Sequence, residues 1–370
     1  MSFFKQKVEE LLNSAGISIN GSKPWDIQVN NSKLYRRLLL QGALGLGESY
    51  MDGWWDCQRI DMMVDRLIRA NLHERVKGVS AFINLMVAST MNLQSKTRAF
   101  IVGQKHYDIG NDLYGAMLDE GMNYSCAYWQ RAQDLNQAQV DKLDLCCRKL
   151  KLRPGMKVLD IGCGWGGFAF YAAANYGASV HGITISQEQV DYCNEHQIGN
   201  NVTVDLKDYR SLHEEYDAII SIGMFEHVGY KNYRQYMEVV HRCLKPDGLF
   251  LLHSIGGNKS VHSGDPWTEK YIFTNSMLPS IKQTSKASEG LFVWEDVQNF
   301  GAYYDKTLMA WYDNFRKAWP ALENKYGYRF YRMWAYYLLS CAGSFRSRKN
   351  QLWQIVLAKG GVDGVYQAER

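Results

Sequence analysis

The residues best suited to chemistry surround a glycine-rich stretch at residues 157–167, which reads Lys-Val-Leu-Asp-Ile-Gly-Cys-Gly-Trp-Gly-Gly. The glycines let the backbone turn tightly and approach a ligand closely. The apolar residues before them predict a strand and residues 168–174 predict a helix, an arrangement that binds nucleotides at the helix N-terminus. The spacing Gly162-x-Gly164-x-x-Gly167 matches the dinucleotide fingerprint, which by itself is a weak signal. An ordinary glycine turn with Asp160 as a helix cap is the alternative.

The residues after the next predicted strand indicate which cofactor binds. A dinucleotide site expects a carboxylate there for the ribose hydroxyls, but residues 178–185 end in Thr184, with Gln187 and Gln189 beyond. This counts against NAD. Asp160 stands at the mouth of the glycine loop, where a carboxylate would repel a pyrophosphate and attract a cation. S-adenosylmethionine carries a sulfonium and an ammonium group, so it is the favoured ligand.

Three further strands are predicted to complete a parallel sheet. Residues 201–206 form an alternating run that ends at Asp208 and Tyr209, where an acceptor and an aromatic ring could meet adenine. Residues 216–222 and 249–253 are the other two strands, the second preceded by a turn at 244–248. Repeated β-α units imply right-handed crossovers, and the ligand should lie at the carboxyl ends of the strands.

Several motifs together carry a family resemblance. The glycine loop, Gly-Ile-Thr-Ile-Ser at 182–186, Met-Phe-Glu-His-Val-Gly at 224–229 and Leu-Lys-Pro-Asp-Gly at 244–248 look like class I S-adenosylmethionine-dependent methyltransferases. With Tyr-Asp-Ile-Gly-Asn-Asp-Leu-Tyr at 107–114, Tyr-Ser-Cys-Ala-Tyr-Trp at 124–129 and the aromatic C-terminal third, the chain resembles the cyclopropane-fatty-acyl-phospholipid synthase family from about residue 20 to residue 360. The resemblance implies an α/β fold: a Rossmann-like class I methyltransferase sheet with a smaller helical N-terminal domain.

The resemblance also implies a reaction and its residues. The family transfers a methylene from S-adenosylmethionine across the cis double bond of an unsaturated acyl chain in a membrane phospholipid. A bound bicarbonate removes a proton from the transferred methyl group, and the loss of this proton closes the ring. The positions that match the bicarbonate site are Cys126, Glu226, His253, Ile255 (through its backbone) and Tyr304, while Cys341 matches the position traditionally assigned as the active-site cysteine. The expected cofactor contacts are Tyr124, Ser125, Asp160, Gly162, Gly164, Gly166, Thr184, Gln189, Asp208 and Tyr209.

The chemistry itself asks for a base but for no nucleophile. An isolated double bond can only offer its π electrons to the methyl carbon, which leaves a positive charge on the acyl chain until a proton is lost. The protein must therefore supply a dry, electron-rich cavity and a base. Cys341 gains no role from this argument, and a buried packing thiol is an equally good interpretation. For Glu226 and His227 the alternative is a buried pair of structural use only.

Length and composition indicate two domains in a globular protein. We place a helical, lipid-interacting domain at residues 1–95 and the S-adenosylmethionine-dependent catalytic domain at 96–370. Residues 1–98 hold 13 Lys and Arg against 9 Asp and Glu, which accounts for the whole net charge of +4. This excess of basic residues has two alternative explanations. One is a solvated helical face, and the other is attraction to anionic phospholipid through the residues Arg36, Arg37, Arg66, Arg69, Arg75 and Lys77.

Other function classes are poorly supported. No dense basic run suits nucleic acid, and the eight cysteines form no Cys-x-x-Cys pair, so we expect neither a zinc site nor a disulfide framework. No stretch approaches 18 apolar residues, and the N-terminus does not resemble a signal peptide. We expect a cytoplasmic protein, peripherally associated with the inner face of the membrane, and the resemblance implies a homodimer.

Outside the sheet, the pattern predicts helices that must position these residues. They are placed at 3–15, 32–40, 61–70, 82–91 and 137–152, with a linker at 92–98 and glycine breaks at Gly42, Gly45 and Gly47. Residues 264–345 hold many aromatic side chains, which suit either a large core or a pocket around an acyl chain and a cation.

Two rival functions stay open at this point. One is an enzyme of the same fold that makes another product, such as a mycolic-acid cyclopropane or a branched or hydroxylated chain. The other is a lipid-binding or scaffolding protein that has lost catalysis, against which the intact Asp160, Gly162, Gly164, Glu226 and His253 argue.

Overall fold

The computed structural model describes residues 3–72, 110–196 and 201–370. Two compact units divide the chain. One comprises Met1–Asn92, His262–Thr274 and Tyr304–Asn350, and the other comprises Leu93–Val261, Asn275–Tyr303 and Gln351–Arg370. The predicted helix at 82–91, the linker at 92–98 and the domain boundary at 95/96 lie outside the described residues, as do Arg75 and Lys77.

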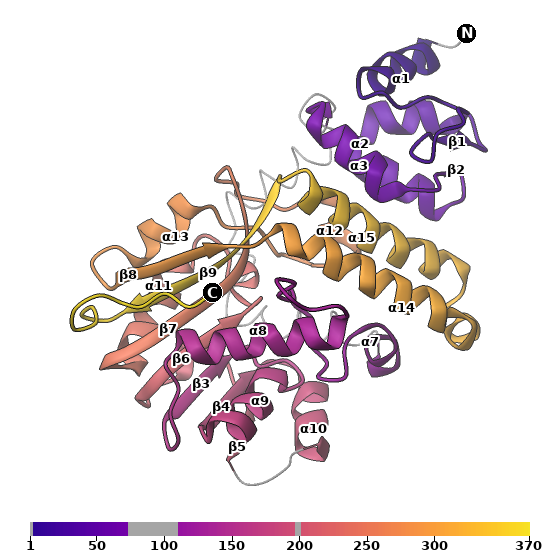
Figure 1. Cartoon of the computed structure of the whole chain (residues 1–370). Coiled ribbons are helices and arrows are strands. Elements are labelled where there is room, and N and C mark those ends of the chain that lie inside the picture. The colour runs from indigo at the N-terminus through magenta and orange to yellow at the C-terminus, as the bar shows by residue number, and fades with distance from the viewer. Residues whose placement is uncertain (1–2, 73–109, 197–200) are drawn as a thin grey trace. The chain divides into compact units, whose positions relative to one another are not determined.

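A seven-stranded sheet with the order β5-β4-β3-β6-β7-β9-β8 forms the centre of the second unit (Figure 1). The five predicted strands are present as β3 (Lys157–Ile161), β4 (Ser179–Thr184), β5 (Val202–Leu206), β6 (Tyr216–Ile222) and β7 (Leu244–Gly257). These five pair in parallel throughout. The turn at 244–248 appears as an irregularity at the start of β7, since Tyr216 pairs with Leu244 but Ala218 pairs with Leu249.

Two strands near the C-terminus extend the sheet beyond the prediction, which ended it at residue 253. They are β8 (Val293–Asn299) and β9 (Asn350–Ala358), and they pair antiparallel. The sequence analysis missed β8 because it includes Glu, Asp, Gln and Asn and lies at the sheet edge, where only one side of the strand needs a partner. It missed β9 because a short apolar run does not distinguish a strand from a helix.

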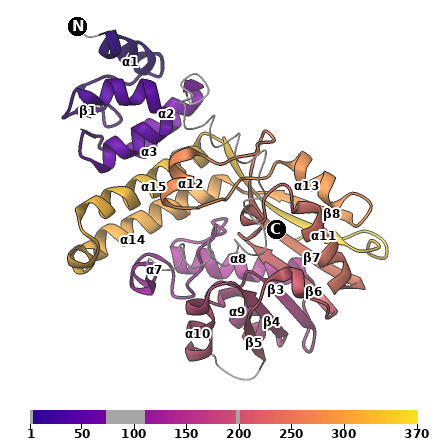
Figure 2. The same cartoon turned by 180° about the vertical axis from the view of Figure 1, so that it is seen from behind.

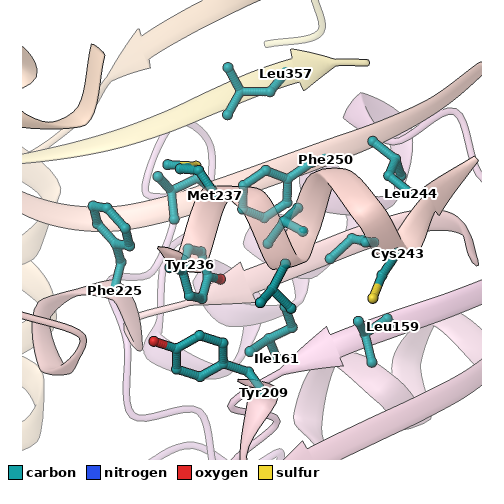
Figure 3. Packing of buried hydrophobic residues seen from close by; sticks show 14 of the residues in the cluster. Leu159, Ile161, Tyr209, Phe225, Tyr236, Met237, Cys243, Leu244, Phe250 and Leu357 are labelled. Atoms are coloured by element: carbon teal, nitrogen blue, oxygen red, sulfur yellow. The ribbon is translucent and has the colours of Figure 1, made fainter. Parts of the chain in front are cut away.

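Helices cover both faces of this sheet. Successive strand residues point to opposite faces, so Val158 packs with α8 (Leu135–Lys149) and α9 (Gly167–Tyr176), while Leu159 packs with α11 (Tyr233–Cys243). Figure 2 shows the arrangement from behind, and Figure 3 shows the α11 side, where Tyr236 and Met237 lie among side chains of the strands. This three-layer arrangement fixes the strand ends that build the site.

Short elements connect these layers. In the second unit they are α7 (Asn111–Met117), α10 (Gln187–His196), the 3₁₀ turns η1 (Tyr209–Ser211) and η2 (Phe225–His227), and α13 (Ile281–Ser288). The helix α8 begins as expected for an N-cap, because the Asp134 carboxylate accepts from the backbone N–H of Gln137 at 2.9 Å. The helix ends at Lys149, three residues before the predicted end at residue 152, and Gly155, with φ of +82°, lies in the turn before β3.

The first unit joins the N-terminal helices to three helices from later in the chain. It contains α1 (Phe3–Ser14), β1 (Gln28–Val29), α2 (Lys33–Met51), β2 (Trp55–Asp56) and α3 (Ile60–Arg69), with α12 (Pro266–Tyr271), α14 (Ala302–Tyr326) and α15 (Tyr328–Arg346). Arg346 of α15 binds both Asp61, at 2.6 Å, and Asp305, at 2.8 Å. The helices α3, α14 and α15 are therefore joined by one cluster of charged side chains, of which Asp61 is fully buried.

Of the three predicted glycine breaks in α2, the one at Gly42 is confirmed and the other two are wrong. The chain kinks at Gly42, where φ is +55°, and the helix then continues to Met51. A Cβ on Gly47 would overlap the Trp267 ring, and one on Gly45 would overlap the carbonyl oxygen of Arg37. Both glycines are required for close packing rather than for a break.

Candidate active site

The candidate site is built at the carboxyl ends of the parallel strands in the second unit. Because β3 pairs with β4 on one side and β6 on the other, the residues that follow these strands meet at one edge of the sheet. The glycine loop lies between β3 and α9, with φ of +82° at Gly162 and +57° at Gly164. A Cβ on Gly164 would meet no atom within 4 Å, so open space lies directly in front of this backbone.

Asp160 is the charged residue beneath this loop. Only 2 % of its surface is exposed, and burial raises the pKa of its carboxyl to about 7, although the charge of Lys142 offsets part of the rise. A buried carboxylate with one cation nearby gains from a second positive charge. The site therefore favours a cationic ligand over an anionic pyrophosphate.

The predicted ribose contacts lie together after β4. Thr184 and Gln189 are both buried, and the Thr184 hydroxyl donates to Oε1 of Gln189 at 2.6 Å. The backbone N–H of Ser186 in turn donates to the Thr184 hydroxyl at 3.2 Å. The side chains of Thr184 and Gln189 are thus held at the end of β4 by one hydrogen bond between them and by one from the backbone of the turn into α10.

Asp208 and Tyr209 follow β5 as expected, but both are already engaged. The Asp208 carboxylate accepts from the backbone N–H and the guanidinium of Arg210, each at 2.9 Å. The Tyr209 ring is 4 % exposed and packs edge-on against Tyr236 in the core below α11 (Figure 3). Arg210, which the sequence analysis did not single out, is the residue that orients this acceptor.

The segment Tyr124-Ser125 is held by two buried side chains of α8. Lys142 donates to Oδ1 of Asn123 at 3.1 Å and to the Ser125 hydroxyl at 3.2 Å, and Gln139 donates to the Ser125 carbonyl at 2.9 Å. The sequence analysis missed both residues. Their spacing of three, on a helix whose buried positions are otherwise apolar except for Lys149, was the available signal.

An aromatic contact joins this segment to the glycine loop. The Tyr114 ring of α7 lies 5.2 Å from Tyr124 and 4.9 Å from Trp165 of the loop, measured between ring centroids. The Trp165 indole N–H donates to Oδ1 of Asn111 at 3.0 Å. The described end of the 107–114 motif therefore packs on the loop, although residues 107–109 lie outside the described part of the chain.

Glu226, His253 and Ile255 meet where β6 and β7 end. Ile222 pairs with His253 across the two strands, and the backbone N–H of Ile255 donates to Oε1 of Glu226 at 2.7 Å. Phe225 anchors the turn before Glu226 by stacking on Tyr233 with 4.3 Å between centroids. Two atoms, Oε2 of Glu226 and Nε2 of His253, are buried and have no hydrogen-bond partner among the described residues.

Burial sets the protonation of this pair. It raises the pKa of the Glu226 carboxyl to about 7, although the hydrogen bond from Ile255 offsets part of the rise. It lowers the pKa of His253 well below the ordinary value, and the charges of Lys142 and Lys149 lower it further. The site thus offers an ionisable acceptor and a neutral imidazole at neutral pH. Buried polar atoms without partners are costly, so both atoms would gain from a hydrogen bond with a small polar ligand.

The remaining three predicted residues are placed differently. Cys126 is fully buried in the second unit, with its thiol 3.4 Å from the Ala127 carbonyl oxygen. Tyr304 and Cys341 belong to the first unit. There the Tyr304 ring packs against Phe345 and Trp311 at 4.5 and 5.8 Å between centroids. Burial raises the pKa of Cys341 to about 12, so this thiol is not a thiolate at neutral pH.

The part of the chain that carries these residues is similar in sequence to known proteins. The family model for mycolic acid cyclopropane synthetase matches residues 94–355. The chain is 54% identical to the cyclopropane-fatty-acyl-phospholipid synthase of Escherichia coli (strain K12), over 96% of this chain and 94% of that protein.

Two solved structures are similar to this chain, each over 70% of its length. The cyclopropane synthase MmaA2 from Mycobacterium tuberculosis superimposes with a TM-score of 0.65 at 31% identity, covering 70% of this chain and 98% of that one. Mycolic acid cyclopropane synthase CmaA1 complexed with SAH and CTAB gives a TM-score of 0.65 at 32% identity, covering 70% and 97%. The α/β fold with a Rossmann-like class I methyltransferase sheet is thereby confirmed.

Proposed function

The chain belongs to the mycolic acid cyclopropane synthetase family and is an S-adenosylmethionine-dependent methyltransferase, and from this premise we propose that its substrate is a phospholipid in a membrane. In the proposed reaction a methylene from S-adenosylmethionine is added across the cis double bond of an unsaturated acyl chain, giving a cyclopropane fatty acyl chain. The positive charge formed on the acyl chain is removed when bicarbonate takes a proton from the new methyl group.

The length of chain that matches each relative favours a phospholipid over a mycolic acid as the substrate. The family model begins at residue 94, so it does not cover the preceding residues. The E. coli phospholipid enzyme, however, matches 96% of this chain. The N-terminal residues are therefore shared with the relative whose name specifies a phospholipid.

The glycine loop and the strand ends support the proposed cofactor site. Asp160 would attract the cationic cofactor, and the open space in front of Gly164 leaves room for it, while Gly162 and Gly166 would flank it in the same loop. Thr184 with Gln189 would contact the ribose, and Asp208 with Tyr209 would lie near adenine. Tyr124 and Ser125, whose segment packs on the loop through Tyr114, would cover the cofactor.

The two unpaired atoms of Glu226 and His253 support the proposed bicarbonate site. Bicarbonate has one O–H donor and several acceptor oxygens, so it complements a carboxylate and an imidazole N–H. Glu226 would accept the proton of the bound ion and His253 would donate to its oxygen. The Ile255 N–H, which already donates to Glu226, would act by orienting that carboxylate.

Cys126, Tyr304 and Cys341 are assigned to the site by resemblance. The buried thiol of Cys126 and the phenol of Tyr304 would donate to bicarbonate. Cys341 needs no role, since the reaction uses no nucleophile from the protein and the raised pKa of this thiol disfavours one.

A membrane surface and a homodimer complete the proposal. Among the described residues no helix has the length and the apolar character of a membrane span. Lys33, Arg36 and Leu40 lie three and four positions apart on α2, and all three are exposed. We place this face against anionic phospholipid at the cytoplasmic side of the membrane, in a dimer of two identical chains.

Product analysis with a labelled cofactor tests the proposal. The protein is incubated with vesicles of unsaturated phosphatidylglycerol and phosphatidylethanolamine and with S-adenosylmethionine carrying a trideuterated methyl group. Cyclopropanation predicts products that keep two of the three deuterium atoms and lack the double bond. A product with all three deuterium atoms, or one with an added hydroxyl, would replace this function by that of a different lipid methyltransferase. Calorimetric titration with the cofactor separates both outcomes from a protein without catalysis.

A further inference from the structure

The polar side chain of Gln354 lies deep in the apolar part of strand β9, next to the candidate site. Gln354 is flanked by Trp353 and Ile355, and none of its surface is exposed. Its amide nitrogen lies 3.2 Å from Nδ1 of His253 and 3.2 Å from Sγ of Cys146. A buried amide in a strand core is costly unless it makes specific hydrogen bonds.

The contact with Gln354 bears on which nitrogen of His253 carries the proton. His253 is buried and electrically neutral at physiological pH, because burial and the charges of Lys142 and Lys149 lower its pKa. A neutral imidazole has one N–H and one acceptor nitrogen. With the amide in this orientation, in which Oε1 has no partner among the described residues, the N–H of Gln354 donates to Nδ1; Nδ1 is then the acceptor and the proton is on Nε2.

We infer that Gln354 is a positioning residue that holds His253 in the tautomer with the proton on Nε2. That nitrogen is buried and has no hydrogen-bond partner among the described residues. It is therefore a donor left available on β7, the strand whose Ile255 N–H orients Glu226. The use of this donor for an anion rests on the function proposed above, whereas the tautomer itself does not.

The other tautomer would work against the proposed reaction. With the proton on Nδ1, the nitrogen at Nε2 would present a lone pair to the oxygens of bicarbonate, and the two acceptors would repel each other. Outer hydrogen-bond partners that fix the orientation and tautomer of a histidine in this way affect activity by about 10- to 100-fold in metal sites. We expect an effect of similar size here.

Nitrogen NMR of the whole protein with ¹⁵N-labelled histidine tests the inference directly. The signals of His253 are identified by their loss in His253→Asn. The wild-type protein should show an unprotonated Nδ1 and a protonated Nε2. A protonated Nδ1 in the wild-type protein would overturn the inference, and this reading needs no variant of Gln354.

Substitution then shows whether Gln354 sets the tautomer. Gln354→Met removes the amide at similar volume, and we expect His253 to lose its single tautomer while kcat falls about 10- to 100-fold and the affinity for S-adenosylmethionine is unchanged. Gln351→Met is the matched control, since Gln351 is also a buried glutamine of β9 but bonds to Asn299 instead. An unchanged tautomer and full kcat in Gln354→Met would refute the assignment. If the wild-type protein shows the expected tautomer but its activity does not depend on bicarbonate, only the proposed base is contradicted, and the inference about Gln354 stands.

Discussion

The backbone N–H of Ile255 donates to Oε1 of Glu226 at 2.7 Å, so strand β7 holds a carboxylate that the turn after β6 supplies. The other oxygen of the same carboxylate has no hydrogen-bond partner in the described part of the chain. One oxygen is thus used to orient the side chain, and the second is left for a ligand. This division is what the proposed bicarbonate site requires of Glu226.

Replacing Glu226 by glutamine should separate these two roles. Glu226→Gln keeps an oxygen that can accept from Ile255 but loses the carboxylate that would accept a proton. We expect kcat to fall by about 10²- to 10⁴-fold, as for a lost general base, while the affinity for S-adenosylmethionine is unchanged. Steady-state kinetics and calorimetric titration measure the two quantities. A joint loss of affinity and melting temperature would indicate a structural role.

The stability of the same variant should depend less on pH. The pKa of Glu226 is about 7 in the folded protein, against an ordinary value of 4.5, so the folded state holds this proton more tightly than the unfolded state does. The free energy of unfolding therefore contains a term that decreases as pH rises from 4.5 to 7. Glu226→Gln lacks this term, and its melting temperature relative to the wild type should rise between pH 5 and pH 8. A relative melting temperature that falls over this range contradicts the raised pKa.

Binding of S-adenosylmethionine should strengthen as pH rises toward 7.5. Burial raises the pKa of Asp160 to about 7, so below that pH the carboxyl is largely neutral and attracts a cation weakly. We expect the affinity to increase by up to about tenfold per pH unit between pH 6 and pH 7. Asp160→Asn should bind more weakly at pH 7.5 and show a flatter pH profile. Equal pH profiles for the two proteins would exclude Asp160 as the group responsible.

The open space before Gly164 can be probed with a methyl group. Gly164→Ala places this group where the cofactor is proposed to lie, and calorimetry should show weaker binding. Gly155→Ala is the control, because Gly155 also has a positive φ and an unobstructed Cβ position but lies at the other end of β3. Both substitutions strain the backbone by about 1–2 kcal/mol, so the two variants should lose similar stability. Only Gly164→Ala should also bind the cofactor less tightly. If both variants bind the cofactor equally well, the proposed pocket is wrong.

Attraction to the membrane should depend on the exposed face of α2. Lys33 and Arg36 form no ion pair within residues 3–72, 110–196 and 201–370, whereas Arg37 binds Glu48 and Asp52. The double variant Lys33→Glu/Arg36→Glu should bind anionic vesicles less tightly in a sedimentation assay, with about 1 kcal/mol lost per removed basic charge.

Charge reversal elsewhere provides the control for that assay. Lys282→Glu/Lys286→Glu makes the same change of net charge on the exposed surface of α13. Equal losses of binding in the two double variants would show that only net charge matters. Deletion of residues 1–95 is a poorer test, because it removes Asp61 and leaves Arg346 without one of its two partners.

The sequence predicted the features that depend on neighbouring residues. The glycine loop, the five parallel strands and Glu226 at the end of a strand follow from local patterns of apolar residues and glycines. The contacts of Gln354 with His253 and of Lys142 with Asn123 were not predictable in this way, because they join residues 101 and 19 positions apart. Gly45 and Gly47 were misinterpreted for a similar reason, since their role is to admit other atoms rather than to break a helix.

The aromatic C-terminal region shows the same limit. Its composition suited a core or a pocket for each ring and favoured a pocket for the set, but the structure places Trp311, Phe315 and Trp334 fully in the core of the first unit. Whether a ring is enclosed by protein depends on which helices surround it. A count of aromatic residues along the sequence does not contain that information.

Dependence on bicarbonate is the most direct test of the proposed mechanism. Turnover is measured with unsaturated phospholipid vesicles in buffer freed of carbon dioxide, and again after bicarbonate is returned. We predict that wild-type activity falls on depletion and recovers on return, that S-adenosylmethionine affinity is the same in both buffers, and that Glu226→Gln stays slow in both. A wild-type enzyme equally active in both buffers, together with an active Glu226→Gln, would contradict the assignment of bicarbonate held by Glu226 as the base.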